Sequence, residues 1–343
     1  MTVTKRHLLN ATLLLAIAAP GQNARVQTAA QERPLQAPPL TTQISPSENS
    51  ELSLPAPMLQ PLLDFKNSDI KFNLYTFMNT LKDRNHEGWV LAVYPDPQTS
   101  KPLIGAGFSL EVMATEHIQR DPLNPHPFIE PSSAQLWQAA GLAPDQLESV
   151  LARFNRNLST WGQKNYRRKA KMHTLPPDLT EEEATRLLRI SAIQAIENAK
   201  AYCRRFDQLT APQQMALSQL VYQMGVNLEE FVQFLSALND DSSPMGLPHS
   251  DSSIDEATRW KTVQHTLVES QWARHYALRA VSVIAMFDPG YVENPTAAER
   301  QIEAAIRPSV KHRRRRASTG SLRARNTTDH NKGHNSKQKR NLT

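Results

Sequence analysis

The segment 86–108 joins a predicted helix end to a predicted β-hairpin, and this junction constrains the fold more than any other part of the chain. Apolar residues at helical spacing lead up to Glu87-Gly88, where glycine is typical of a helix end. Strand-like and turn-like patterns follow it. The pattern predicts, in order, a helix, a strand, a turn and a return strand: 74–81, 90–94, 95–102 and 103–108.

The region from Thr180 onward predicts a helical bundle. Thr180 with Glu183, and Thr210 with Gln213, form capping boxes, whose side chains satisfy free backbone N–H groups at a helix start. Apolar residues recur at helical spacing after each box and in three later stretches. The predicted helices begin near 181, 211, 231, 257 and 272. A helix–hairpin unit followed by this bundle predicts a mainly helical α+β fold, with a cleft where the hairpin faces the bundle.

The first 30 residues have the pattern of an export signal. Lys5 and Arg6 precede an apolar run at 8–19, and small residues at 16–18 and 28–30 offer cleavage sites. The run is short for a membrane span, so a retained anchor is the weaker alternative. We therefore expect an exported protein, either periplasmic or secreted.

Composition divides the rest of the chain. It has 343 residues, of which 24 are prolines and 39% are hydrophobic, and this indicates a folded domain diluted by unfolded segments. Seven prolines lie in 31–61, as expected for a linker. Of the 39 Lys and Arg residues, 12 lie in 306–343 beside one Asp, so the positive charge belongs to a tail. The expected order is signal peptide (1–30), linker (31–61), folded domain (62–305) and disordered basic tail (306–343).

Glu87 and Asp96 are candidates for a pair of catalytic carboxyls. Cleavage of a glycosidic bond needs one protonated carboxyl, which donates to the leaving oxygen, and one carboxylate, which stabilises the positively charged transition state or activates water. Glu87, at the helix–strand junction, is the better candidate acid, and Asp96, in a Pro-Asp-Pro turn, is the better carboxylate. Two solvated acids at turn positions are the alternative, because the chain has 33 acidic residues.

The residues around this acid pair resemble the core motif of the phage-type lysozymes, glycoside hydrolase family 24. Three later blocks, in the same order, resemble further segments of that family: LTEEEATRLL at 179–188, VYQMG at 221–225, and SQW with RAVSVIAMF at 270–272 and 279–287. The core motif is EG-x-x-L-x-x-Y-x-D followed by IG-x-G, here Glu87, Gly88, Leu91, Tyr94, Asp96, Ile104, Gly105 and Gly107. The resemblance covers about 62–305 and includes an insertion at about 109–179. For that proline-rich insertion we expect loops and short helices, either solvated or covering a cleft edge.

The resemblance implies a lysozyme-like fold, with a small helix/β-hairpin lobe, a helical-bundle lobe and a cleft between them. It also implies cleavage of the β-1,4 bond between N-acetylmuramic acid and N-acetylglucosamine in the glycan strands of peptidoglycan. Glu87 matches the family's general acid and Asp96 its second catalytic carboxylate. Tyr94 and Gln223 match substrate-site positions, and Arg279 matches a basic residue facing the saccharide–peptide substrate. On their own, Gln223 fits equally a capping or surface amide, and Arg279 an ordinary ion pair.

Two residues depart from the family pattern. Leu103 stands where the family usually has a threonine whose hydroxyl helps to hold the attacking water, and Phe108 replaces a histidine. Leucine has no hydrogen-bonding group, so it cannot orient water. Thr99 or Ser100 in the turn is an alternative source of a hydroxyl. The departure leaves three functions open, which are a hydrolase, a lytic transglycosylase and a protein that binds peptidoglycan without cutting it.

The remaining features limit cofactors and partners. The single cysteine, Cys203, excludes an intramolecular disulfide and a cysteine-built zinc site and is most simply a core residue. No metal or cofactor is implied, and we expect a monomer. The tail contains KHRRRR at 311–316, which fits anionic envelope polymers or a nonspecific solubilising role. It lacks the stacking aromatics of specific nucleic-acid readers, so we expect no specific nucleic acid.

Overall fold

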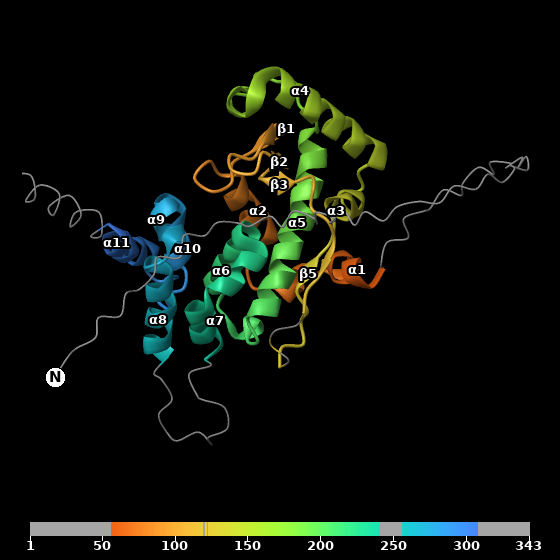
Figure 1. Ribbon diagram of the computed structural model, residues 1–343. Coiled ribbons are helices and arrows are strands. Elements are labelled where there is room, and N and C mark those ends of the chain that lie inside the picture. The colour runs from red at the N-terminus through yellow and green to blue at the C-terminus, as the bar shows by residue number, and fades with distance from the viewer. Residues whose placement is uncertain (1–55, 119–120, 122, 241–255, 308–343) are drawn as a thin grey trace, which may run out of the picture. The chain divides into compact units, whose positions relative to one another are not determined.

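Helices make up most of the structure and the strands form two small antiparallel sheets, which confirms the predicted mainly helical α+β class (Figure 1). The computed structural model describes residues 56–118, 121, 123–240 and 256–307. Its contacts divide the chain into two units, Met1–Glu51 and Leu52–Thr343, and every described residue lies in the second. The first elements are α1 (Ala56–Asp64), η1 (Asn67–Asp69), α2 (Leu74–Lys82), β1 (Val90–Pro95), β2 (Pro102–Gly105), β3 (Phe108–Ser109), β4 (Thr115–Glu116), β5 (Ile129–Glu130), α3 (Ser133–Ala139) and α4 (Pro144–Lys171). The later elements are α5 (Glu181–Tyr202), η2 (Phe206–Gln208), α6 (Ala211–Met224), η3 (Gly225–Glu230), α7 (Val232–Asn239), α8 (Glu256–Val268), α9 (Gln271–His275), α10 (Ala277–Ala285) and α11 (Pro295–Ile306).

The predicted helix and hairpin form, with one change in the return strand. The sheet has the order β1-β2-β3, and Tyr94 of β1 pairs with Leu103 of β2. The expected strand 103–108 is wrong as a single strand, because the chain turns after Gly105 and comes back as β3. Gly105 and Gly107 have φ values of 64° and 81°, which glycine adopts without the strain of a Cβ atom. The Gly-x-Gly segment is therefore a tight turn.

The folded part begins earlier than the sequence indicated. Helix α1 starts at Ala56, inside the range 31–61 that was assigned to the linker, and the predicted start near Leu62 is therefore too late. Leu59 and Leu62 are both buried, which fixes this helix to the core. The signal peptide, the rest of the linker and the tail from 308 onward lie outside the described residues.

The prediction of loops and short helices for the insertion 109–179 is also wrong. Helix α4 has 28 residues, with a break at Gly162, whose φ of 68° is not helical. Trp137 of α3 and Tyr166 of α4 are fully buried, so the insertion contributes to the core. Helix α4 packs against β1, and in Figure 1 it lies above the strands whereas α2 lies below them. One face of the hairpin is therefore covered by the insertion.

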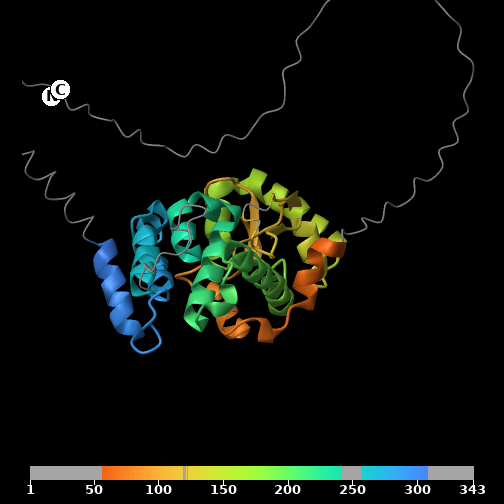
Figure 2. The same cartoon turned by 90° about the horizontal axis from the view of Figure 1, so that it is seen from below.

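Helix α5 is the central element of the fold. The predicted capping box is present, since the Glu183 backbone N–H donates to the Thr180 hydroxyl and the Glu183 carboxylate accepts from the Thr180 N–H. The box of Thr210 with Gln213 at the start of α6 is present too. Helix α5 contacts α1, α2, α3, α6, β2 and β5, and both views show it running between them (Figures 1 and 2). Cys203, directly after α5, is buried in the core as predicted.

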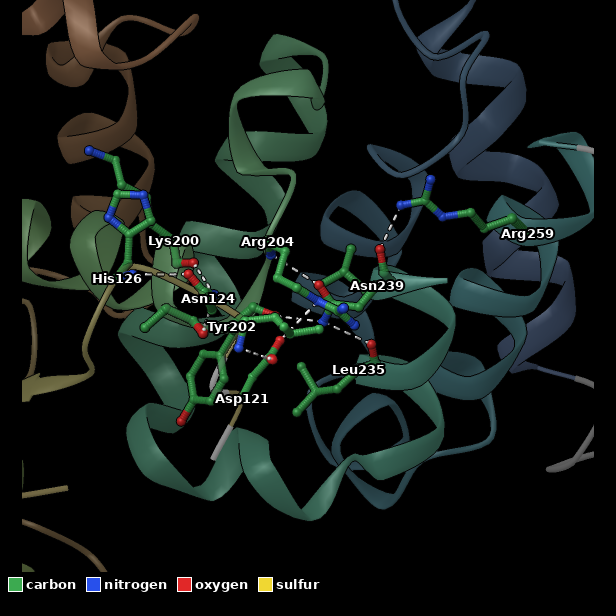
Figure 3. A network of polar contacts seen from close by, with 12 residues as sticks. Asp121, Asn124, His126, Lys200, Tyr202, Arg204, Leu235, Asn239 and Arg259 are labelled. Carbon is green, nitrogen blue, oxygen red and sulfur yellow. Dashed lines mark hydrogen bonds and ion pairs between the residues drawn. The ribbon is translucent and has the colours of Figure 1, made fainter. Parts of the chain in front are cut away.

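Amide side chains from two other segments close the C-terminal end of α5 (Figure 3). The Asn124 Nδ2 donates to the carbonyl oxygens of Lys200 at 2.9 Å and Ala201 at 2.8 Å, and the Asn239 Nδ2 donates to that of Tyr202 at 2.8 Å. The last carbonyls of a helix have no partner within it, so these bonds satisfy them. Asn124 belongs to the insertion, which is thus attached to the central helix by polar contacts as well as by its core residues.

The C-terminal helices lie beside α6 and α7. The predicted helix 272–287 is two helices, α9 and α10, because the backbone of Tyr276 leaves the helical region between them. Helix α11 packs against α10 and α8, at the edge of the structure in both views (Figures 1 and 2). Within the ranges that the structure describes, none of the helices combines the length and the apolarity needed to cross a lipid bilayer.

Candidate active site

Glu87 lies on a tight turn between α2 and β1. The helix ends at Lys82, and the Glu87 backbone N–H then donates to the Leu81 carbonyl at 3.2 Å. Gly88, with a φ of 81°, donates its N–H to the Asp83 carbonyl at 3.0 Å and turns the chain into the strand. A residue with a Cβ atom is strained in that conformation. The turn thus fixes the backbone of Glu87 at the helix–strand junction, as the sequence predicted.

The carboxyl group of Glu87 is paired with Arg279, which comes from α10. The Arg279 Nη1 lies 2.7 Å from Glu87 Oε1, and the two side chains are 10% and 21% exposed. Arg279 also donates to the backbone carbonyl of His86, and its guanidinium lies 5.4 Å from the ring centroid of Tyr276. Two residues that are far apart in the sequence, each singled out from a different motif block, therefore meet at one buried ion pair.

The surroundings of Glu87 favour its protonated form more than water does. Burial raises the pKa of the Glu87 carboxyl above its ordinary value, and the charges of Arg279 and Lys171 lower that pKa by less. Burial of a carboxyl removes the water that stabilises its negative charge. The pKa of His86 is lowered, first by burial and then by the charge of Arg279, so this neighbour is neutral near pH 7. A raised pKa is one property that a general acid needs, and the ion pair with Arg279 acts in the opposite direction.

Asp96 is held by the turn that follows β1. Its Oδ1 accepts from the backbone N–H groups of Gln98 at 2.9 Å and Thr99 at 2.7 Å, and from the Thr99 hydroxyl at 2.9 Å. The Asp96 carbonyl accepts from the side-chain amide of Gln163 at 2.7 Å, which ties the turn to α4. No described residue donates a hydrogen bond to Oδ2. The turn thus supplies a hydroxyl at Asp96, as one alternative from the sequence anticipated, and leaves one carboxylate oxygen open.

Tyr94 connects the two acids. Burial of its phenol raises the pKa of Tyr94 to about 12. The negative charges of Glu87 and Asp96 act in the same direction, and the positive charge of Arg167 opposes them. Both carboxyls therefore lie within electrostatic range of one phenol group. Lys171 of α4 places its Nζ 5.7 Å from the centroid of the Tyr94 ring. Tyr94 is therefore neutral near pH 7 and lies close enough to both candidate carboxyls to be influenced by their charges.

The VYQMG block contacts both the SQW block and the Gly-x-Gly turn. The Tyr222 hydroxyl donates to the Ala106 carbonyl at 3.1 Å, so α6 is attached to the Gly-x-Gly turn. The Trp272 Nε1 donates to the Gln223 side-chain carbonyl at 3.0 Å. Gln223 is half-buried, and one acceptor position of its side-chain oxygen is taken by this tryptophan.

A groove begins at the Gly-x-Gly turn and contains about 220 Å³. Gly107 belongs to its lining, and a Cβ atom on Gly107 would lie 3.7 Å from Glu87 Oε2, so the Glu87 carboxyl is next to one lining residue, although neither Glu87 nor Asp96 lines the groove itself. The insertion forms one wall, and α5 with α6 forms the other. The wall residues are Val112, Phe128, Glu130, Pro131, Ser133 and Leu136 on the first side, and Ser191, Gln194, Ala195, Asn198, Val221, Tyr222 and Gly225 on the second.

Leu103, the main departure from the lysozyme motif, has a packing role. It pairs across the sheet with Tyr94, and its side chain packs against a cluster formed by Val90, Tyr94 and Ala170 of α4. An apolar residue fits this position because helix α4 of the insertion packs against the hairpin here.

We expect Leu103→Thr to lower stability by about 1 kcal/mol, because apolar contacts with α4 are lost. Hydrolysis of peptidoglycan should not increase, since the new hydroxyl would face the α4 contact. Thermal unfolding and the release of soluble fragments would measure both effects. A large gain in hydrolysis would contradict this assignment and would mean that threonine restores a missing water-holding group.

Sequence reasoning missed Arg167 and Lys171, which lie near Glu87 and Tyr94. No role was assigned from the sequence to the basic residues of the insertion, which was expected to be either solvated or at a cleft edge. Their spacing of four residues, which places both on one helix face, is the signal that was available. Along the parts of the chain that the structure describes, no three His, Cys, Asp or Glu side chains are grouped to hold a metal ion.

Comparison of the chain with protein-family models, with curated proteins and with solved structures finds no match.

Proposed function

We propose that this protein is a glycosidase that cleaves peptidoglycan at the β-1,4 bond between N-acetylmuramic acid and N-acetylglucosamine, as the phage-type lysozymes do. One observation carries the proposal. A carboxyl with a raised pKa, Glu87, is paired with Arg279 and lies close to Gly107, a residue that lines a groove. A groove beside a buried acid is the arrangement that glycoside cleavage needs.

Each carboxyl has a separate task in this mechanism. Glu87 in its protonated form donates to the glycosidic oxygen as the bond to the sugar breaks. Asp96, with one oxygen held in the turn and the other open, stabilises the positive charge that develops on the sugar ring and directs water to it. The Thr99 hydroxyl, 2.9 Å from Asp96 Oδ1, lies where it can accept a hydrogen bond from that water.

The meeting of the separated motif blocks gives further support. Glu87 pairs with Arg279, Gln223 with Trp272, and Tyr222 with the carbonyl of Ala106, although these blocks lie far apart in the sequence. A chance resemblance of short motifs does not require that they converge on one site.

The direct test is mass spectrometry of the fragments that the mature protein releases from purified peptidoglycan. Hydrolysis predicts new reducing ends on N-acetylmuramic acid. If 1,6-anhydro ends appear in their place, the protein is a lytic transglycosylase. If the protein stays on the peptidoglycan and releases no fragments, the site binds without cutting, and the glycosidase proposal is wrong.

The proposal also predicts how activity depends on pH. Only protonated Glu87 can donate, so kcat/KM should fall as pH rises through a pKa that lies above the ordinary glutamate value. Lys171→Gln removes a charge that lowers the pKa of Glu87, so this alkaline limb should move to higher pH. Lys164→Gln removes an exposed charge from the same helix and should leave the limb in place. A limb that does not respond to Lys171→Gln would exclude Glu87 as the titrating acid.

A further inference from the structure

Two basic residues of the insertion lie beside the candidate acid, and the glycosidase mechanism does not use them. Arg167 and Lys171 are four residues apart on α4, so their side chains share one helix face. Tyr166 and Ala170, which directly precede Arg167 and Lys171 in the sequence, are fully buried and fix this turn of the helix against the rest of the protein. The Lys171 Nζ lies 5.7 Å from the centroid of the Tyr94 ring. The pair is therefore held over the same face of the hairpin as Tyr94.

Neither cation has an ion-pair partner among the described residues. Arg167 is half-buried, and its Nε is buried without a hydrogen-bond partner. Burial and the charge of Arg167 lower the pKa of Lys171, against the opposing charge of Glu87. Like charges on adjacent helical turns repel each other, so the arrangement costs stability unless an anion lies near.

Most of the carboxylate oxygens near this pair already have partners. Glu87 is bonded to Arg279 at 2.7 Å, and Asp178, which accepts from the Val93 N–H, is paired with Arg153 at 2.9 Å. Asp96 has its Oδ1 committed to its own turn. Tyr94 and His86 are neutral near pH 7. Two of these three carboxyls are thus paired with other arginines, and none of the three forms an ion pair with Arg167 or Lys171.

We propose that Arg167 and Lys171 bind a carboxylate of the peptide that branches from the glycan strand, and so select acidic peptidoglycan over uncharged sugar polymers. This inference rests on the proposed function, because it assigns the basic pair to the same substrate. A guanidinium offers a planar fork that matches a carboxylate, an ammonium adds a point charge, and the Tyr94 hydroxyl is a further donor. The insertion supplies both cations, so it determines specificity as well as forming a groove wall.

A bound carboxylate would also act on Glu87. Lys171 lowers the pKa of Glu87, and an anion between them reduces that influence. Binding of the acidic peptide therefore favours the protonated form of the proton donor. Arg167 and Lys171 are positioning residues in this scheme, since they touch the substrate's peptide and not the reacting sugar bond.

The test compares Arg167→Gln/Lys171→Gln with Lys164→Gln/Arg168→Gln. The control pair lies on the same helix, is exposed, and removes the same charge. Calorimetry would measure the binding of purified disaccharide–tetrapeptide fragments. These end in N-acetylmuramic acid, so they lack the bond from this sugar to the next N-acetylglucosamine and cannot be cut. The fragments would be tested in two forms. One form has free carboxyls, and the other has them converted to amides with carbodiimide and ammonia. Thermal unfolding of each variant, together with that of the single variant Lys171→Gln, would check that the fold is kept.

We expect the wild type and the control to bind the free-carboxyl fragment roughly tenfold or more tightly than the amidated one. The Arg167→Gln/Lys171→Gln variant should bind both alike, with the single variant between. The carboxylate site would be overturned if the double variant still preferred the free-carboxyl fragment over the amidated one, or if the control variant lost that preference.

The outcomes for the two proposals are separable. Fragment release from peptidoglycan without any preference for free carboxyls keeps the glycosidase and removes the carboxylate site. Preference for free carboxyls without fragment release keeps the carboxylate site and removes the glycosidase. Absence of both fragment release and binding excludes both.

Discussion

Glu87→Gln is expected to slow the release of peptidoglycan fragments by about a thousandfold, within the range that a general acid contributes. The amide keeps the shape of the carboxyl and can still accept from the Arg279 guanidinium, which lies 2.7 Å from Glu87 Oε1. Its N–H protons are too weakly acidic to be transferred to a departing sugar oxygen. Initial rates on purified peptidoglycan, followed by the appearance of reducing ends, would measure the effect.

The loss must be separated from unfolding. Glutamine removes a buried charge that the site stabilises poorly, as the raised pKa of Glu87 shows, and it retains one acceptor for Arg279. Thermal unfolding of the variant should therefore stay close to that of the wild type. Glu148→Gln, an exposed residue on α4, makes the same change in charge and should retain full activity. An active Glu87→Gln protein would mean that another group donates the proton.

Local patterns predicted those parts of the fold that are set by neighbouring residues. The capping boxes at Thr180 and Thr210 place the starts of α5 and α6, because they satisfy backbone groups within one turn. The glycine after Glu87 marks the junction that carries the candidate acid. The pairing of Glu87 with Arg279 could not be read from spacing, because it depends on the tertiary fold that brings α10 to the turn between α2 and β1.

The insertion was misjudged for two physical reasons. Its apolar positions Leu147, Val150 and Phe154 do follow helical spacing, but Gly162 interrupts the period and the flanking prolines suggest loops. A basic cluster on a helix is commonly solvated, and only tertiary packing shows that one side of this cluster faces Tyr94. The packing role of Leu103 was missed for the same reason, because its apolar contact comes from α4, which is distant in the sequence.

Substitution of Trp137 distinguishes an insertion that is part of the hydrophobic core from one that is a solvated addition to the domain. This side chain is fully buried, and its Nε1 donates to the Ala143 carbonyl at 2.9 Å. Trp137→Ala removes a large apolar group and leaves a cavity, so it should destabilise the protein by about 3 to 5 kcal/mol. For a folded part of this size, that corresponds to a fall in Tm of roughly 10 °C, measured by thermal unfolding.

Met113→Ala provides the matched control, because Met113 lies in the same insertion but is 80% exposed. Its effect should stay within about 0.5 kcal/mol, as is usual for surface substitutions. If the insertion were a solvated addition to an independent domain, the two variants would unfold at nearly the same temperature. A large fall for Trp137→Ala alone would mean that the insertion belongs to the core. Leu136, which precedes Trp137 in the sequence, lines the groove. Trp137→Ala should therefore also weaken the binding of peptidoglycan fragments, which would connect the stability of the insertion to the proposed site.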